Sequence, residues 1–482
     1  MHAPSPSRWS MLQFTWVSFF LTFVVWFNLA PFTSSIARSL NLTPEQVKTL
    51  LICNVALTIP ARIGVGMLVD RFGPRKVFTA ILLAFAAPCV FCAVATEYWQ
   101  LVVARLLVSG IGAGFVVGIR LVSEWFDARE IGLAEGIYGG LGNFGMAAAT
   151  FGLPLLALAW GGENGWRFAM IVSAVLCVLW AGVFYRFVRD TPPGKTFTRP
   201  TQSGALAVSS RGDLLALIAM QVPLVLCLGV MAWKLVAVGL LPPLASYGVY
   251  GLLALLLAQQ VRKIWTVNRA VASGSAEPEH EYSFAQVAIL CLCYAVTFGG
   301  ELAVESMLPH YLEGMFGLSV ASAGALGGGF VVASLIARPL GGYLGDRYGR
   351  RPVMIISLAG SALGFLAINQ IGPHWPLWGV MVVVFLAGVF LMAANGANFC
   401  IAPLIRKPLT GQIAGLIGAY GNVGSVAFLT ILSLATPTVF FLSMAVTGAA
   451  AFGACFLLKE PARLPAREPE ALPAPAAAPA FA

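Results

Sequence analysis

The stretch GMLVDRFGPRK, residues 66–76, returns later in the chain as GGYLGDRYGRR, residues 341–351. Both stretches contain the pattern G-x-x-x-D-R-x-G, with its acid at Asp70 and Asp346. Each motif follows an apolar segment that contains one arginine, Arg62 or Arg338. Since 346 − 70 and 338 − 62 both equal 276, the loop and its arginine recur together. The chain is therefore built from two related halves.

The two arginines lie deep within apolar segments, each eight residues before the aspartate of its motif. Eight helical residues rise about 12 Å, which places Arg62 and Arg338 near the midplane of a hydrocarbon core about 30 Å thick. A charge at that depth costs about 2.5–3.5 kcal/mol on insertion scales and is a candidate functional residue by default. Two symmetry-related cations predict a site for a small anion, although structural ion pairing is the alternative.

The composition is that of an integral membrane protein. Of the 482 residues, 59% are hydrophobic and only 10% are charged, and the mean hydropathy is +0.85, far from the values of soluble domains. Runs long enough to span a bilayer are expected at 14–33, 50–70, 77–95, 100–123, 132–158, 166–187, 213–232, 236–258, 284–308, 321–345, 353–371, 377–402, 411–435 and 438–458. We expect about fourteen membrane spans.

The spans group as six, two and six. This predicts an N-terminal six-helix bundle (1–189), an inserted segment with two hydrophobic helices (190–283), a C-terminal six-helix bundle (284–459) and a disordered tail (460–482) rich in Pro, Ala and Glu. Pro223, Pro242 and Pro243 could break the inserted helices, so a partly embedded hairpin is the alternative to two full spans.

The distribution of basic residues predicts the orientation. Most of the 29 Lys and Arg residues fall on the side that holds both termini, which we expect to be the cytoplasmic face of the inner membrane. The few basic residues expected on the outer side are Arg38, Lys48, Arg167 and Lys234. The net charge of +9 follows from this topology and does not imply nucleic-acid binding.

No pattern in the chain predicts an enzyme, a metal site or a cofactor. The nine cysteines have no disulfide or metal-ligand spacing and are expected to be packing residues. No nucleophile–base pair is evident either.

A glycine pattern repeats as well. Two segments share a 4, 3, 4 spacing and an offset of 279: Gly132, Gly136, Gly139 and Asn143 match Gly411, Gly415, Gly418 and Asn422, and Gly142 and Gly145 match Gly421 and Gly424. This spacing places the residues on one helix face, where glycine lets helices approach closely. An amide at that depth needs a partner, so the asparagines either pack or face a substrate path. Two such halves are typical of secondary transporters.

The loop motifs resemble the signature of the major facilitator superfamily, as does Arg105 in RLLVSGIGAG (105–114). The stretches GGLGNFG (139–145) and GAYGNVG (418–424) are similar to the paired glycine-rich signatures of its nitrate/nitrite porter family. GFVVGIRLVSEWF (114–126) and YAVTFGGELAVESML (294–308) also resemble that family. The likeness covers both halves in order and implies a major facilitator fold of two pseudo-symmetric bundles, here extended by an inserted hairpin.

The resemblance implies a binding site for nitrate or nitrite between Arg62 and Arg338. Phe115 and Phe298 would sandwich the planar anion, and Tyr294 would donate a hydrogen bond. Asn143 matches a polar family residue, whereas Asn422 is assigned by internal symmetry. The chemistry agrees, because guanidinium is planar, forked and permanently charged. The phenylalanines alone would more often be core-packing residues, and only their association with the arginines favours a functional role.

The acidic residues suggest how transport is coupled and gated. Glu301 lies within a span, where a carboxyl is either paired or protonated. It is expected either to pair with Arg120 or to take part in proton coupling. The loop residues Asp70, Arg71, Asp346 and Arg347 are expected to hold helices together at the cytoplasmic side through Asp–Arg and helix-end contacts.

We therefore expect a monomeric transporter of nitrate and nitrite in the lipid bilayer, working by alternating access, either as a nitrate/proton symporter or as a nitrate/nitrite exchanger. A transporter of another small organic anion is the first alternative. A non-transporting nitrate sensor, signalling through residues 190–283 or the tail, is the second.

Overall fold

The computed structural model describes residues 7–160, 164–200, 204–237, 239, 241–274 and 282–460, and the regular elements among them are helices. The predicted tail lies outside the described residues, apart from Glu460. Thirteen helical stretches of the described chain are long and apolar enough to cross a membrane. A further helix, α16 (Val320–Tyr348), has 29 residues and packs between α8 and α18. The predicted all-helical membrane fold is confirmed.

The helices of the N-terminal half are α1 (Arg8–Phe27), η1 (Ala30–Phe32), α2 (Thr33–Ser39), α3 (Pro44–Ala56), α4 (Thr58–Phe72), α5 (Pro74–Val94), α6 (Tyr98–Ser109), η2 (Gly110–Ala113), α7 (Gly114–Trp125), α8 (Ile131–Ala147), η3 (Ala148–Gly152), α9 (Leu153–Trp160) and α10 (Gly165–Phe187). Those of the insert are α11 (Arg211–Ala219), α12 (Gln221–Ala237), α13 (Pro243–Val267) and α14 (Arg269–Ser273). The C-terminal half holds α15 (Phe284–Phe316), α16, α17 (Arg350–Asn369), α18 (Leu377–Ile405), η5 (Lys407–Leu409), α19 (Thr410–Leu434) and α20 (Pro437–Cys455).

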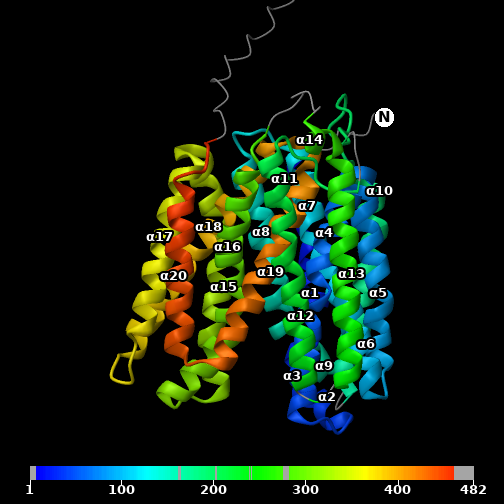
Figure 1. Ribbon diagram of the computed structural model, residues 1–482. Coiled ribbons are helices and arrows are strands. Elements are labelled where there is room, and N and C mark those ends of the chain that lie inside the picture. Colours follow the sequence, from blue (N-terminus) through cyan, green and yellow to red (C-terminus); the bar gives the residue numbers. More distant parts are fainter. Residues whose placement is uncertain are drawn as a thin grey trace, which may run out of the picture.

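Helix packing follows the sequence repeat. Within the halves, α1 packs on α8 as α15 packs on α19, and α5 packs on α10 as α17 packs on α20. Between the halves, α4 packs on α19 and α16 packs on α8. Figure 1 shows the N-terminus and α14 at one end of the molecule, with α2 and α3 at the other. The two interfaces between the halves therefore involve the helices that carry the paired arginines and the glycine faces.

A break in the second span positions Arg62. The helix stops at Leu57, whose backbone N–H donates to Ser109 Oγ at 3.1 Å, and restarts at Thr58, whose hydroxyl donates to the Ser109 carbonyl at 2.6 Å. Pro60 lies in the first turn of the new helix, where its missing N–H is tolerated. These contacts fix the start of α4 against the end of α6, one turn before Arg62.

The insert forms two full-length helical stretches, Arg211–Ala237 and Pro243–Val267. Proline does not interrupt them, because Pro223 follows the junction between α11 and α12 and Pro243 is the first residue of α13, a position that suits proline. Two spans therefore fit the structure better than a partly embedded hairpin.

Candidate functional site

Arg62 is fully buried where the two halves meet. Its Nε donates to the Gly112 carbonyl at 3.3 Å, and its Nη1 donates across the interface to the Gly418 carbonyl at 2.5 Å. Its Nη2 has no hydrogen-bond partner among the described residues. A buried donor without a partner is costly, so this nitrogen is poised to bind an acceptor that is not part of the chain.

Three aromatic rings surround the Arg62 guanidinium. Its Cζ lies 5.0 Å from the ring centre of Phe298, 5.8 Å from Phe115 and 5.9 Å from Trp26. These are cation–π distances. The rings keep water from the cation while stabilising its charge.

Tyr294 stacks on both phenylalanines. Its ring centre lies 6.3 Å from that of Phe115 and 5.0 Å from that of Phe298, with interplanar angles of 3° and 7°. Tyr294 and Phe298 are one helical turn apart on α15, which explains their parallel rings. The structure thus brings the three predicted aromatic residues together, but as a stack that includes Tyr294.

Arg338 has an acidic partner. Its Nη2 lies 2.5 Å from Glu301 Oε2. The amide of Asn143 donates to Glu301 Oε1 at 2.8 Å, and the amide of Asn395 donates to Oε2 at 2.7 Å. All four side chains are buried. Glu301 therefore accepts from three donors, which lie on α16, α8 and α18. It also pairs with the Arg338 guanidinium, which an anion bound between the two arginines would need.

Of the two alternatives predicted for Glu301, the pairing with Arg120 was wrong. Arg120 instead contacts Asp70 at 3.2 Å and Glu124 at 3.0 Å. The reason is helix direction: Phe115 and Phe298 lie level beside Arg62, but from there α7 and α15 carry Arg120 and Glu301 toward opposite ends of the molecule. Five and three helical residues in opposite directions separate them by roughly 12 Å along the axis.

The two motif aspartates close one end of the molecule, which we call the latch end. Asp70 accepts the backbone N–H groups of Gly411 and Gln412, both at 2.9 Å. Asp346 accepts those of Gly132 and Leu133 at 3.1 and 2.9 Å. Each carboxylate thus binds the N-terminus of a helix in the opposite half, where the helix dipole favours an anion.

The arginines of the latch are not those predicted. Arg71 and Arg347 are exposed; Arg71 lies over the Phe72 ring and Arg347 donates to the Tyr343 hydroxyl. Instead, Arg120 forms an ion pair with Asp70, and Arg350 forms one with Asp346 at 2.9 Å. Arg350 is part of the second loop motif, so its place in the motif was the signal that could have identified it.

The repeated glycines position the arginines. A Cβ on Gly415 would lie 2.5 Å from the Arg62 carbonyl oxygen, and one on Gly136 would lie 2.6 Å from that of Arg338. One turn on, Gly418 and Gly139 face the two guanidinium side chains. The backbones could not approach this closely with any side chain present.

The next glycines leave room for the aromatic residues and the first helices of each half. Gly142 faces Phe19, Gly145 faces the Phe20 carbonyl, Gly421 faces Tyr294 and Phe298, and Gly424 faces the Ala295 carbonyl. The asparagine between them differs between halves. Asn143 holds Glu301, whereas the amide atoms of Asn422 have no partner among the described residues.

Replacing Gly415 by alanine is expected to lower the free energy of unfolding by about 1–3 kcal/mol, because the methyl group would overpack the α4–α19 crossing. Thermal unfolding of the purified protein in detergent measures the effect. Gly64→Ala is the matched control, since a Cβ there would meet nothing within 4 Å. Equal melting temperatures for the two variants would contradict the close crossing.

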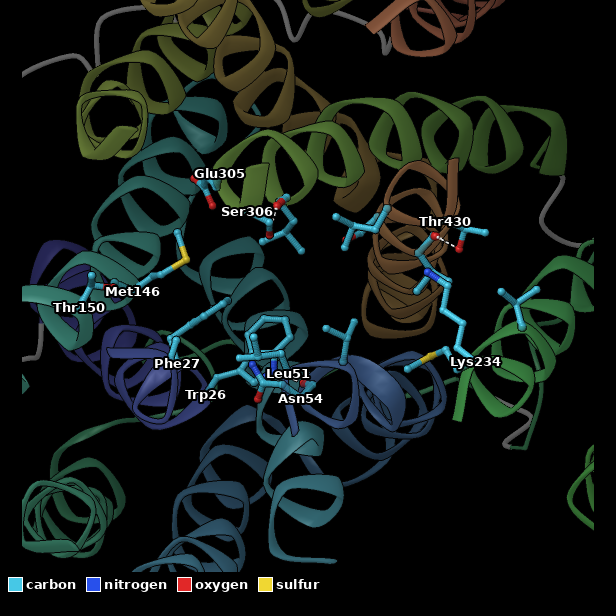
Figure 2. Close-up of a pocket in the computed structure, with 18 residues that line it drawn as sticks. Trp26, Phe27, Leu51, Asn54, Met146, Thr150, Lys234, Glu305, Ser306 and Thr430 are labelled. Atoms are coloured by element: carbon cyan, nitrogen blue, oxygen red, sulfur yellow. Dashed lines mark hydrogen bonds between the residues drawn. The ribbon is translucent and has the colours of Figure 1, made fainter. Parts of the chain in front are cut away.

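A cavity of about 440 Å³ opens beyond the arginines, away from the latch end. Its lining includes Trp26, which contacts Arg62, and Glu305, one turn beyond Glu301. Figure 2 shows these side chains around the cavity, with Lys234 on the side opposite Glu305. The cavity and the latch thus lie on opposite sides of the two arginines.

Two further buried polar residues, Asn395 and Arg105, have different roles. Asn395, in ANGAN of α18, was missed because neither repeat offset, 276 or 279, relates it to an asparagine in the first half. Arg105 donates to the Trp26 carbonyl at 2.7 Å and to Asn28 at 3.0 Å, and it also contacts Asn54. Arg105 therefore holds together the first helices rather than facing the site.

The chain matches the Major Facilitator Superfamily over residues 15–266 and 290–481. It is 42% identical to "Nitrate/nitrite transporter NrtP" of Nostoc punctiforme, covering 94% of this chain and 93% of that protein. The chain belongs to the nitrate/nitrite porter family of the major facilitator superfamily. A second relative of the same name, from Picosynechococcus, is 40% identical with the same coverage. "Probable nitrate/nitrite transporter NarK2" of Mycobacterium tuberculosis is 27% identical over 85% of this chain and 84% of its own length.

Solved structures support the fold. The proton:xylose symporter XylE superposes with a TM-score of 0.64 at 14% identity, covering 94% of this chain and 96% of that one. The human organic anion transporter MFSD10 superposes with a TM-score of 0.63 at 12% identity, covering 93% and 100%. At such identities the likeness concerns the fold alone. The porter family predicted from the loop and glycine motifs is confirmed by the sequence relatives.

Proposed function

We propose that this protein carries nitrate and nitrite across the membrane as a secondary transporter working by alternating access. One observation carries the proposal: Arg62 is buried among aromatic rings yet keeps its Nη2 without a partner in the described structure. A planar oxyanion can accept hydrogen bonds from the forked guanidinium. The two NrtP relatives are named for these same two anions.

The ring stack supports a flat substrate. Phe115, Tyr294 and Phe298 are nearly parallel beside Arg62, so an anion that enters between or against them must be thin. Nitrate and nitrite are planar, whereas sulfate and phosphate are tetrahedral and wider in every direction. A larger organic anion would need space that the rings fill.

The orientation follows from charge. The segments that leave the latch end after α10 and α13 carry Arg189, Lys195, Arg199 and Arg269. By the positive-inside rule this end faces the cytoplasm, and both termini lie there in a multi-pass inner-membrane protein. The cavity then faces outward, so the structure corresponds to an outward-facing state.

We propose a monomer as the working unit.

The Glu301–Arg338 pair favours proton coupling. Nitrate and the Glu301 carboxylate compete for the same guanidinium, because Arg338 Nη2 lies 2.5 Å from Glu301. A proton on Glu301 removes the competing charge and releases Arg338 to close on nitrate bound at Arg62. The anion and the proton therefore bind together, which is symport.

The charge balance is consistent with a complete transport cycle. Without substrate, Arg62, Arg338 and ionised Glu301 together carry a single net positive charge. With one proton and one nitrate bound, the net charge is the same. The empty carrier can therefore reorient as readily as the loaded one, and the repulsion between two bare arginines that would enforce nitrate/nitrite exchange is absent.

Uptake into proteoliposomes tests both the substrate and the coupling. We expect an inward proton gradient to drive nitrate accumulation into vesicles free of nitrite. Uptake that requires internal nitrite and ignores the gradient would reject symport and leave exchange. No uptake of either anion under either condition would reject the proposed function.

A further inference from the structure

The inserted helix α12 contacts both halves of the molecule. It contacts α3 of the N-terminal half and α19 of the C-terminal half, while α13 packs on α12 (Figure 1). Three polar contacts join the insert to α19: the Tyr420 hydroxyl donates to the Met220 carbonyl at 2.7 Å, the Cys227 thiol faces the Val423 carbonyl at 3.7 Å, and Lys234 Nζ donates to Ser433 Oγ at 2.9 Å. The insert is therefore built into the wall between the halves.

This wall includes one cation. Val230, Met231 and Lys234 of α12 line the 440 Å³ cavity. Among the described lining residues, Lys234 is the basic side chain and Glu305 is the acidic one. Figure 2 shows Lys234 reaching from α12 beside Thr430 of α19, with Glu305 across the cavity. The cavity thus has a positive side and an acidic side.

Lys234 is hydrogen-bonded to a neighbouring helix and also lines the cavity. Lysine near a helix end ordinarily extends toward the membrane surface, and Lys234 is three residues from the end of α12. Its ammonium donates to Ser433 Oγ of α19, one residue before that helix ends, and its side chain lines the cavity. An ammonium has three donors, and the hydrogen bond to Ser433 uses one of them. The remaining donors are available to an anion in the cavity.

We propose that Lys234 captures the incoming oxyanion in the outward-facing cavity and raises its local concentration before it reaches Arg62. This proposal rests on the proposed function, since it assumes an anionic substrate. A cation on the wall of a cleft with low-dielectric sides attracts ions of opposite charge and speeds their entry. It acts mainly on the encounter step and is sensitive to salt.

Trp26 borders both the cavity and the Arg62 guanidinium. Trp26 lines the floor of the cavity, and the Arg62 guanidinium lies 5.9 Å from its ring. In the proposed path, an anion leaves Lys234, passes Trp26 and reaches the Nη2 of Arg62, which has no partner among the described residues. The insert, in this interpretation, supplies a first binding position to an otherwise standard pair of bundles.

The test is nitrate uptake by Lys234→Gln in proteoliposomes. We expect KM to rise about three- to tenfold with kcat within about twofold, and kcat/KM to lose much of its dependence on ionic strength. Lys234→Arg should restore the wild-type KM. Lys263→Gln, on an exposed position of α13, is the matched control and should behave as wild type.

Two outcomes would overturn the proposal. One is an unchanged KM and salt dependence in Lys234→Gln; the other is a fall in kcat at constant KM, which indicates a structural role. Lys234→Met provides a second variant if the glutamine protein is unstable. Wild-type protein that takes up no nitrate would refute the proposed function itself, whereas normal wild-type uptake with an indifferent Lys234 variant refutes only the capture role.

Discussion

Replacing Arg62 by lysine is expected to reduce nitrate uptake at least about 100-fold, corresponding to about 2.7 kcal/mol of lost transition-state stabilisation. The guanidinium donates from Nε to the Gly112 carbonyl and from Nη1 to the Gly418 carbonyl, which leaves Nη2 to bind the substrate. An ammonium has one nitrogen and cannot keep both backbone bonds while binding an oxyanion in a fork. The measurement is the initial rate of uptake per amount of reconstituted protein.

The charge is conserved in this substitution, so geometry alone is tested. Arg262→Lys, at an exposed position of α13, makes the same chemical change away from the site and should leave uptake unchanged. Comparable melting temperatures in detergent would show that the Arg62 variant is folded. Near-normal uptake by that folded variant would refute the role of Arg62 as an anion clamp.

The helices and the paired arginines could be predicted because both depend on local pattern. Apolar length identifies a span, and the common offset of 276 relates Arg62 to Arg338 without any alignment. The glycine faces also follow from spacing, and they meet the opposite half where the repeat requires. Periodicity along one chain is thus enough to place residues on helix faces at a given depth.

Partners across helices were harder to predict. Glu301 was expected near Arg120 because both lie in spans, yet depth depends on helix direction as well as distance from the helix start. Counting helical residues from Phe115 to Arg120 and from Phe298 to Glu301, in opposite directions along the axis, would have placed Arg120 and Glu301 at different depths. Asn395 could not be found in this way, because it has no asparagine counterpart in the first half and its partner, Glu301, lies 94 residues away in sequence.

The sequence pattern also could not predict which helices the insert packs against. Its two helices are apolar enough to be recognised, but an apolar surface does not specify its neighbour. The contact of α12 with α19 includes individual side-chain hydrogen bonds, from Lys234 to Ser433 and from Tyr420 to the Met220 carbonyl. The sequence predicted that the hairpin exists, and only the structure gives it a place beside the cavity.

Glu301→Gln is the variant that separates coupling from binding. Glutamine has the size of glutamate and the neutral charge of its protonated form, so Arg338 is permanently released from its ion pair. The amide of Asn143 has an oxygen without a partner in the described structure and can turn to accept the new N–H. The packing of the site should therefore survive.

We expect Glu301→Gln to lower uptake driven by a proton gradient at least about tenfold, while nitrate/nitrite counterflow stays within a few-fold of wild type. The reason is that the variant still binds the anion between Arg62 and Arg338 but has no carboxyl to load with a proton, and its empty site carries two uncompensated cations that resist reorientation. Glu45→Gln, exposed on α3, is the control. Equal losses of both activities would instead mean that Glu301 only orients Arg338, and undiminished gradient-driven uptake would mean that the proton is carried elsewhere.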